Sequence, residues 1–217
     1  MDETILARRA VIVPLGDAAV LVRFADRLDD EANRLVLALV AALEADPAEG
    51  VVEIVPSLVS VLLRYDPERT DPIRLAGEIG LRPPGRARRG DRHRHLVSVR
   101  FDGPDLEEVA AALGLDAAGF IDRHNAAELR VLATGFAPGF VYCGFHPETL
   151  VLPRRRRVRP LVPAGSVLFA AGQTAIAATE IPTGWHVIGT TDFRNFDPRR
   201  DPPTQLAAGD AIRFEGR

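Results

Sequence analysis

The sequence contains no lysine, so all 27 of its Lys and Arg positions are arginine. A chain without lysine cannot form a lysine Schiff base, and it cannot carry a Walker A loop, whose lysine reaches the phosphates of a nucleotide. The formal net charge of −3 disfavours a dedicated nucleic-acid-binding protein, which is normally basic over a whole face. We therefore expect no nucleic-acid partner.

Cysteine is nearly absent as well, since Cys143 is the only one. One thiol excludes an internal disulfide framework and a cysteine-only metal site. No apolar run approaches the roughly 18 to 20 residues that span a bilayer. Acidic residues precede the short apolar stretch near the N-terminus, which is not typical of a secretory signal. The sequence thus predicts a cytoplasmic protein with no membrane partner.

The first part of the sequence alternates strand and helix patterns. Two β-rich runs surround the turn signal Gly16-Asp17, and an amphipathic helix follows with Asp29 or Asp30 as its N-terminal cap. Two further strands, 51–55 and 58–65, precede a short helix near 71–79. This ββαββα order predicts a small α+β domain over residues 1–81, with its helices on one face of an antiparallel sheet.

The second part has a different pattern. Residues 82–95 are rich in arginine and almost free of apolar side chains, so they predict a solvated linker between domains. A strand over 96–101 and two short helices follow. From 131 to 214, short β-like runs are separated by Gly and Pro, which is typical of a barrel or sandwich. We therefore expect an α+β chain whose second domain, 96–217, is a β-barrel.

Several ionisable side chains are candidates for catalysis. His124 lies on the apolar face of its predicted helix, where it is either a general acid/base, a carboxylate ligand or a core histidine. Cys143 and His146 form a weaker nucleophile–base candidate, because real Cys/His pairs meet through the fold. His93 and His95 lack a third ligand nearby, so we expect no metal site.

Other segments are typical of ligand binding. Phe136, Phe140 and Tyr142 lie in a Gly/Pro/aromatic loop that forms either an apolar pocket or a buried connection. The arginine run 153–160 suits an anion or an acidic partner, or is a solvated loop. The segment 162–185 places four polar side chains among small residues, as in a small-molecule site: Ser166, Gln173, Thr174 and Glu180.

The ordered motifs GFAPGFVY, LPRR, VPAGSV, AGQT and E-x-P-x-G-W resemble the bacterial 5-oxoprolinase B-subunit family. This family is also labelled allophanate hydrolase subunit 1 and includes a sporulation-kinase inhibitor. The resemblance implies a cyclophilin-like β-barrel for the second domain. It also implies a hetero-oligomer with C-type and A-type companion subunits that uses ATP to open 5-oxo-L-proline to L-glutamate. Because lysine is absent, ATP and its Mg²⁺ are expected on a partner or at a shared surface, and the isolated chain is expected to be inactive.

The same resemblance implies a set of site residues in one cleft that the C-type companion completes. His124 is the implied catalytic acid/base, and the implied substrate-binding residues are Arg154, Gln173, Thr174, Glu180, Ser166, Phe140 and Tyr142. Two alternatives remain open. The first is a regulatory protein that binds and inhibits a histidine kinase, and the second is a subunit of an allophanate- or urea-linked amidohydrolase.

Overall fold

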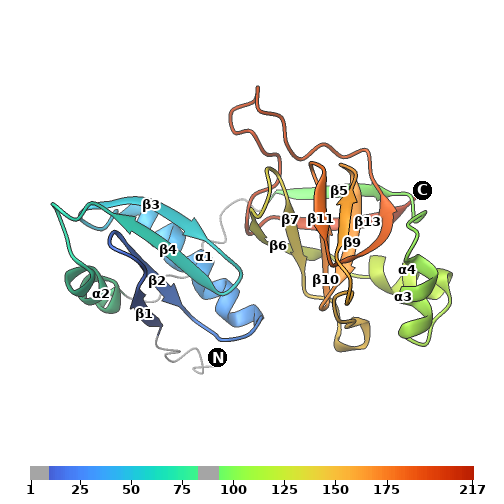
Figure 1. The fold of residues 1–217 in the computed structure, drawn as a ribbon, viewed down its shortest axis with the longest axis horizontal. Coiled ribbons are helices and arrows are strands. Elements are labelled where there is room, and N and C mark those ends of the chain that lie inside the picture. Colours follow the sequence, from blue (N-terminus) through green and yellow to red (C-terminus); the bar gives the residue numbers. More distant parts are fainter. Residues whose placement is uncertain (1–9, 83–92) are drawn as a thin grey trace. The chain divides into compact units, whose positions relative to one another are not determined.

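The computed structural model describes residues 10–82 and 93–217, which belong to two compact units, 1–90 and 91–217 (Figure 1). Most of the predicted linker, 82–95, lies outside the described residues. Its last two residues differ from the prediction, because Arg94 and His95 already belong to strand β5 (Arg94–Val99) and pair with strand β13. No helix within the described ranges is long and apolar enough to cross a membrane.

The first unit has the predicted ββαββα order. Its antiparallel sheet has the strand order β1-β2-β4-β3, with the bounds β1 (Val11–Pro14), β2 (Ala19–Arg23), β3 (Val51–Pro56) and β4 (Ser60–Tyr65). Helix α1 (Asp30–Ala45) begins after Asp29, whose carboxylate accepts from the backbone N–H of Ala32. Helix α2 (Pro72–Leu81) is capped in the same way by Asp71. Both helices bury their apolar faces against one side of the sheet.

The second unit is a curled sheet of seven strands in the order β12-β9-β10-β7-β6-β13-β5. Every neighbouring pair is antiparallel except β13 with β5. Besides β5, its strands are β6 (Leu129–Thr134), β7 (Val141–Gly144), β9 (Ser166–Ala170), β10 (Gln173–Ile176), β12 (His186–Thr190) and β13 (Ala211–Gly216).

Shorter elements complete this second unit. Helices α3 (Leu106–Ala112) and α4 (Ala117–Asn125) connect β5 to β6, and a 3-10 turn covers Glu148–Leu150. Strands β8 (Arg159–Val162) and β11 (Ile181–Thr183) pair as a separate two-stranded sheet. The expected α+β fold, with a small α+β unit followed by a barrel-like β unit, is confirmed.

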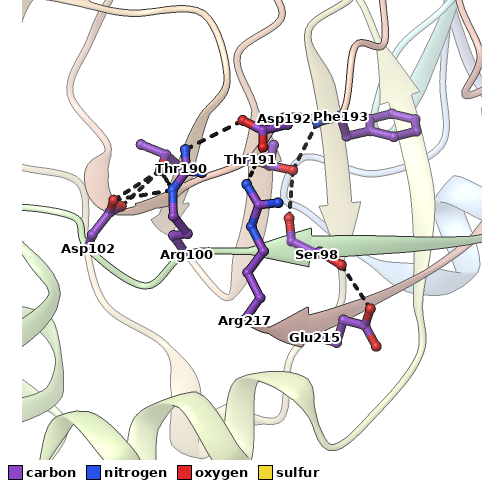
Figure 2. Close-up of polar contacts among 9 residues, drawn as sticks. All are labelled: Ser98, Arg100, Asp102, Thr190, Thr191, Asp192, Phe193, Glu215 and Arg217. Atoms are coloured by element: carbon purple, nitrogen blue, oxygen red, sulfur yellow. Dashed lines mark hydrogen bonds and ion pairs between the residues drawn. The ribbon is translucent and has the colours of Figure 1, made fainter.

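The two edge strands of the curled sheet meet at a seam between Arg100 and Thr190. Each of these residues donates its backbone N–H to the other's carbonyl at 2.8 Å. Figure 2 shows the polar side chains around this contact. The Thr190 hydroxyl donates to Asp102 at 2.9 Å and accepts from Arg100 at 3.3 Å. The seam therefore joins the segment after β5 to the end of β12.

The C-terminal residue Arg217 contacts the region around the seam. Arg100 and Arg217 both pair with Asp192, and the hydrogen bond from Arg217 is the main cause that lowers the pKa of this carboxyl. Beside it, the Ser98 hydroxyl donates to Glu215 at 2.8 Å, which links β5 to β13 across the parallel pair (Figure 2). These contacts are exposed, so each contributes little to stability on its own.

Two glycines allow the backbones to approach at the seam. A Cβ on Gly189 would lie 2.3 Å from the carbonyl oxygen of Arg100, and one on Gly103 would lie 2.3 Å from that of Val187. No side chain fits into these contacts, because the atoms in the way are backbone atoms. The closure of the sheet thus requires glycine at both positions.

The alternation of side chains divides the sheet into two faces. One face, here called the inner core, packs against α3 and α4 and contains Val97, Val109, Phe120, Cys143, Phe169, Ile176 and Phe214, among others. The other face, here called the outer cluster, contains Phe140, Leu168, Ala175, Trp185 and Val187, together with Val162 and Ile181 of the β8–β11 pair. Neighbouring residues of one strand, such as Phe169 and Leu168, therefore lie in different environments.

We expect Gly189→Ala to destabilise the second unit by about 2–3 kcal/mol, because the added methyl group forces the two backbones of the seam apart. Gly216→Ala is the matched control, since its Cβ would make only ordinary contacts at 3.8 Å or more with Phe101 and Ile121. Urea unfolding of both variants measures the difference. Equal stability of the two variants would contradict the role of the glycine at the seam.

Candidate functional site

A chain of four hydrogen-bonded side chains lies in the inner core. Nδ1 of His124 is 2.7 Å from Oδ1 of Asn125, and Nε2 of His124 is 2.7 Å from the hydroxyl of Thr174. The same hydroxyl is 2.8 Å from Nε2 of His146. Helix α4 supplies His124 and Asn125, strand β10 supplies Thr174, and the loop after β7 supplies His146. The order Asn125–His124–Thr174–His146 is called the histidine chain below.

Aromatic rings enclose the histidine chain. The ring of His124 contacts four phenylalanine rings, those of Phe101, Phe120, Phe169 and Phe214, and lies 4.8 Å from the ring of His146. This burial lowers the pKa of His124 to about 4 and that of His146 to about 3, with the neighbouring His124 as the second cause for His146. Both rings are therefore neutral at pH 7.

Cys143 is a poor nucleophile in this structure. It is fully buried in the inner core, and its burial raises the pKa of the thiol. Although Cys143 is opposite Thr174 in the sheet, the hydrogen-bond partner of His146 is the Thr174 hydroxyl. The histidine and the thiol thus do not form the nucleophile–base pair that their spacing allowed as a candidate.

A second group of side chains lies on the opposite face. Phe136, Phe140, Tyr142 and Trp185 form a row of edge-to-face contacts with centroid distances of 5.4, 4.8 and 6.0 Å. The guanidinium of Arg154 lies 5.5 Å from the Trp185 ring and is close enough to Tyr142 to counteract the rise in the pKa of its phenol that burial causes. We call these five residues the aromatic row.

Gln173 lies on the same face of the sheet as the aromatic row. Ala175 pairs directly with Tyr142, and Gln173 shares the face of Ala175 because the two are separated by one residue of β10. Gln173 is 2% exposed, and its Nε2 has no hydrogen-bond partner among the described residues. A buried amide donor without an acceptor is costly unless another molecule supplies that acceptor.

The remaining predicted residues have different surroundings. The hydroxyl of Ser166 donates to the carbonyl oxygen of Pro163 at 2.7 Å, so it is already used within a turn. Glu180 is exposed and makes no hydrogen bond or ion pair with any residue in the described ranges. The structure thus brings His124 together with Thr174, Phe140 with Tyr142, and Arg154 with Tyr142 and Trp185. Gln173 shares only the face of the sheet with Tyr142. The expectation of a single cleft differs from this arrangement, because Thr174 and Gln173 are consecutive in a strand and face opposite sides.

The arginine-rich loop is held by one buried carboxylate. Oδ1 of Asp105 accepts from Arg155 at 2.6 Å and from Arg159 at 2.9 Å, and its Oδ2 accepts from the backbone N–H of Val187 at 2.7 Å. Asp105 is 3% exposed. Two of the five arginines in this loop, Arg155 and Arg159, therefore stabilise the fold. Arg154, by contrast, is exposed and makes no ion pair with a described residue.

Sequence reasoning did not include two important residues in the candidate site. It considered His146 only as a partner of Cys143, although His146 completes the histidine chain. It also omitted Asp105, whose position before a helix resembles an ordinary cap. Trp185 was part of a quoted motif, but its contact with Arg154 depends on how the residue before β12 packs against the arginine-rich loop, which no local spacing reveals.

Comparison with known proteins identifies the family. A family model described as carboxyltransferase domain, subdomain C and D, matches residues 10–206. The 5-oxoprolinase B subunit of Bacillus subtilis (strain 168) is 33% identical over 224 residues, which cover 95% of this chain and 92% of that protein. This chain belongs to the 5-oxoprolinase B-subunit family. The resemblance inferred from the motifs is thereby confirmed.

Solved structures share the fold of this family member. The crystal structure of TTHA0988 is 37% identical with a TM-score of 0.80 and is matched over 92% of this chain, but this chain covers only 40% of that one. The urea amidolyase of K. lactis is 16% identical with a TM-score of 0.69, over 96% of this chain and 15% of that protein. The second likeness concerns the fold alone.

The buried histidines of this family member predict a dependence of stability on pH. Because their pKa values in the folded chain lie well below 6.5, the unfolded chain binds protons first as the pH falls. Their contribution is complete above about pH 6.5 and decreases on acidification toward pH 4, by up to about 1.4 kcal/mol per pH unit for each ring. Urea unfolding between pH 4.5 and 7.5 measures this slope.

The variant His146→Gln removes one of the two buried rings, so we expect a shallower slope below pH 6.5. His93→Gln is the control, because His93 is exposed. An unchanged slope in His146→Gln would show that this ring is not neutral in the folded protein at pH 5.

Proposed function

We propose that this chain is the B-type component of an ATP-dependent 5-oxoprolinase, which opens 5-oxo-L-proline to L-glutamate together with C-type and A-type companion subunits. Membership of the B-subunit family supports a role within an enzyme complex, since the B. subtilis relative carries that name. The observation that carries the proposal is the pair of uncommitted donors at the aromatic row: the buried amide of Gln173 and the guanidinium of Arg154.

These two donors match the polar groups of 5-oxo-L-proline. The substrate has a ring amide with one carbonyl oxygen, and it has one carboxylate. An arginine fork suits the carboxylate, and a side-chain amide N–H suits the carbonyl oxygen. The partly exposed ring of Tyr142 offers apolar surface to the methylene groups of the substrate, whereas Phe140 is 2% exposed and supports Tyr142 from behind, so its predicted binding role stays a prediction. Glu180 and Ser166 are not needed for this binding mode, and their predicted roles stay predictions.

Two kinds of group that often bind ATP and its Mg²⁺ are not found in this protein's described residues. The chain has no lysine, and no three His, Cys, Asp or Glu side chains of the described residues are grouped as a metal-ion site. We therefore propose that ATP binds to a partner protein of the complex or at a shared surface, and that the isolated chain does not turn over substrate.

One observation favours a second function. Phe136, at the end of the aromatic row, is 71% exposed, which is unusual for a large aromatic side chain. Exposed aromatic residues are common at protein interfaces, so this end of the row also suits a partner protein such as the dimerisation helices of a histidine kinase. A urea-linked role rests only on the shared fold.

The assembled complex provides the direct test. Co-expression with the C-type and A-type companions, followed by measurement of ATP hydrolysis with and without 5-oxo-L-proline, is expected to show hydrolysis stimulated by the substrate. Arg154→Gln is expected to raise KM for 5-oxo-L-proline by roughly 10-fold to 100-fold, because a charged hydrogen bond to the carboxylate is lost.

Arg157→Gln is the matched control, since Arg157 is an exposed arginine of the same loop. Its KM is expected to equal that of the unmodified complex. A stable complex without substrate-stimulated hydrolysis would contradict the proposed activity, and tight binding to a kinase would then support the second function. An unchanged KM in Arg154→Gln would remove this arginine from the substrate site.

A further inference from the structure

With the side-chain oxygen of Asn125 facing His124, the histidine chain has one consistent placement of its hydrogen atoms. The carbonyl oxygen of Asn125 only accepts, so Nδ1 of His124 must carry a hydrogen. Because the neutral ring has one N–H, Nε2 of His124 has a free lone pair and accepts from the hydroxyl of Thr174. That hydroxyl has a single hydrogen, which is now used.

The same reasoning fixes the second ring. Since Thr174 has already donated its hydrogen, its contact with His146 must run from Nε2–H of His146 to the hydroxyl oxygen. His146 is therefore the Nε2–H tautomer, and its Nδ1 carries a lone pair. The amide of Asn125 thus sets the tautomer of a histidine three hydrogen bonds away.

The outer end of the chain is uncommitted. Nδ1 of His146 has no hydrogen-bond partner among the described residues, and it is not fully buried. His146 is 7% exposed, whereas His124 is 1% and Thr174 is 0% exposed. Besides the half-buried Asn125 at the other end, Nδ1 of His146 is therefore the position of the histidine chain that a molecule outside the core can reach.

We propose that His146 is the proton-exchanging group of this protein, and that His124 and Thr174 are positioning residues that keep Nδ1 of His146 unprotonated and available. This inference rests on the proposed amide cleavage. There, an attacking water transfers a proton to Nδ1 as its oxygen bonds to the amide carbon. His146 then returns that proton to the ring nitrogen of the substrate as the C–N bond breaks.

The arrangement explains why one ring of the pair takes the proton. The ring of His124 is 4.8 Å from that of His146 and faces the same Phe169, so two positive charges there would repel each other in an apolar environment. One proton is accepted, and the hydrogen bonds through Thr174 to His124 hold the charged ring in place. The histidine chain is thus suited to accept one proton at a time and then release it.

Nuclear magnetic resonance of the isolated ¹⁵N-labelled chain tests the tautomers without any partner or activity. Long-range ¹H–¹⁵N spectra at pH 7 are expected to show Nδ1–H for His124 and Nε2–H for His146. His186 serves as an internal reference, because its Nε2 contacts the carbonyl oxygen of Pro153 and must also carry the hydrogen. An Nδ1–H tautomer of His146 would overturn the proposal.

Variants of Thr174 test the coupling between the rings. Thr174→Val removes the hydroxyl, and we expect His146 to become a mixture of tautomers. Thr174→Ser keeps the hydroxyl and should restore the pure Nε2–H form, which loss of packing alone would not explain. If His146 kept a pure Nε2–H form in Thr174→Val, the hydrogen bonds through Thr174 would not be what sets the tautomer of His146.

The assembled enzyme tests the catalytic part. His146→Gln is expected to lower kcat by roughly 100-fold to 10,000-fold with little change in KM, and His93→Gln should leave both unchanged. An unchanged kcat in His146→Gln would overturn the proposal. If the unmodified complex shows no substrate-stimulated hydrolysis, the proposed function fails, while the spectra of the isolated chain still decide the tautomers.

Discussion

The second unit depends on a contact in which two backbones meet with no side chain between them. Strands β5 and β12 are the edges of the curled sheet, and the hydrogen bonds between Arg100 and Thr190 join them only because Gly103 and Gly189 leave room for the approach. Once the edges are joined, the sheet has an inside and an outside. The inner core fills the inside with helices α3 and α4 and with large apolar side chains. The charged residues around the seam are exposed, so the shape of the backbone has more influence on closure than their charges do (Figure 2).

Because the sheet is closed, consecutive side chains of strand β10 lie in two different environments. Thr174 points inward to two neutral histidines, while Gln173, the residue before it, points outward toward the aromatic row. The proposed site for proton exchange and the proposed site for substrate recognition thus lie on opposite faces of the same strand. The side chain of His146 belongs to the inner core, and its backbone N–H bonds to the carbonyl oxygen of Gly172, the residue before Gln173.

The local parts of this fold were predictable, and the contacts between distant parts were not. The cap at Asp29, the apolar stripe of α1 and the ββαββα order follow from spacings of three and four residues or of two, which the sequence displays directly. The motifs from 135 to 185 identified the family. The role of His146 was missed because it depends on the register that places β10 between β7 and β9, and on a helix that contributes His124 from another part of the chain. Asp105 was missed for the same reason, since its arginine partners are about fifty residues away.

Asp105 limits how the arginine-rich loop, residues 153–160, can move or change. Its single carboxylate binds Arg155, Arg159 and the backbone of β12 together, so the loop has a fixed anchor and cannot drift independently of the sheet. Of the five arginines, Arg155 and Arg159 are thus committed to the architecture. Arg154, Arg156 and Arg157 make no ion pair with any described residue, so replacing them leaves this anchor intact.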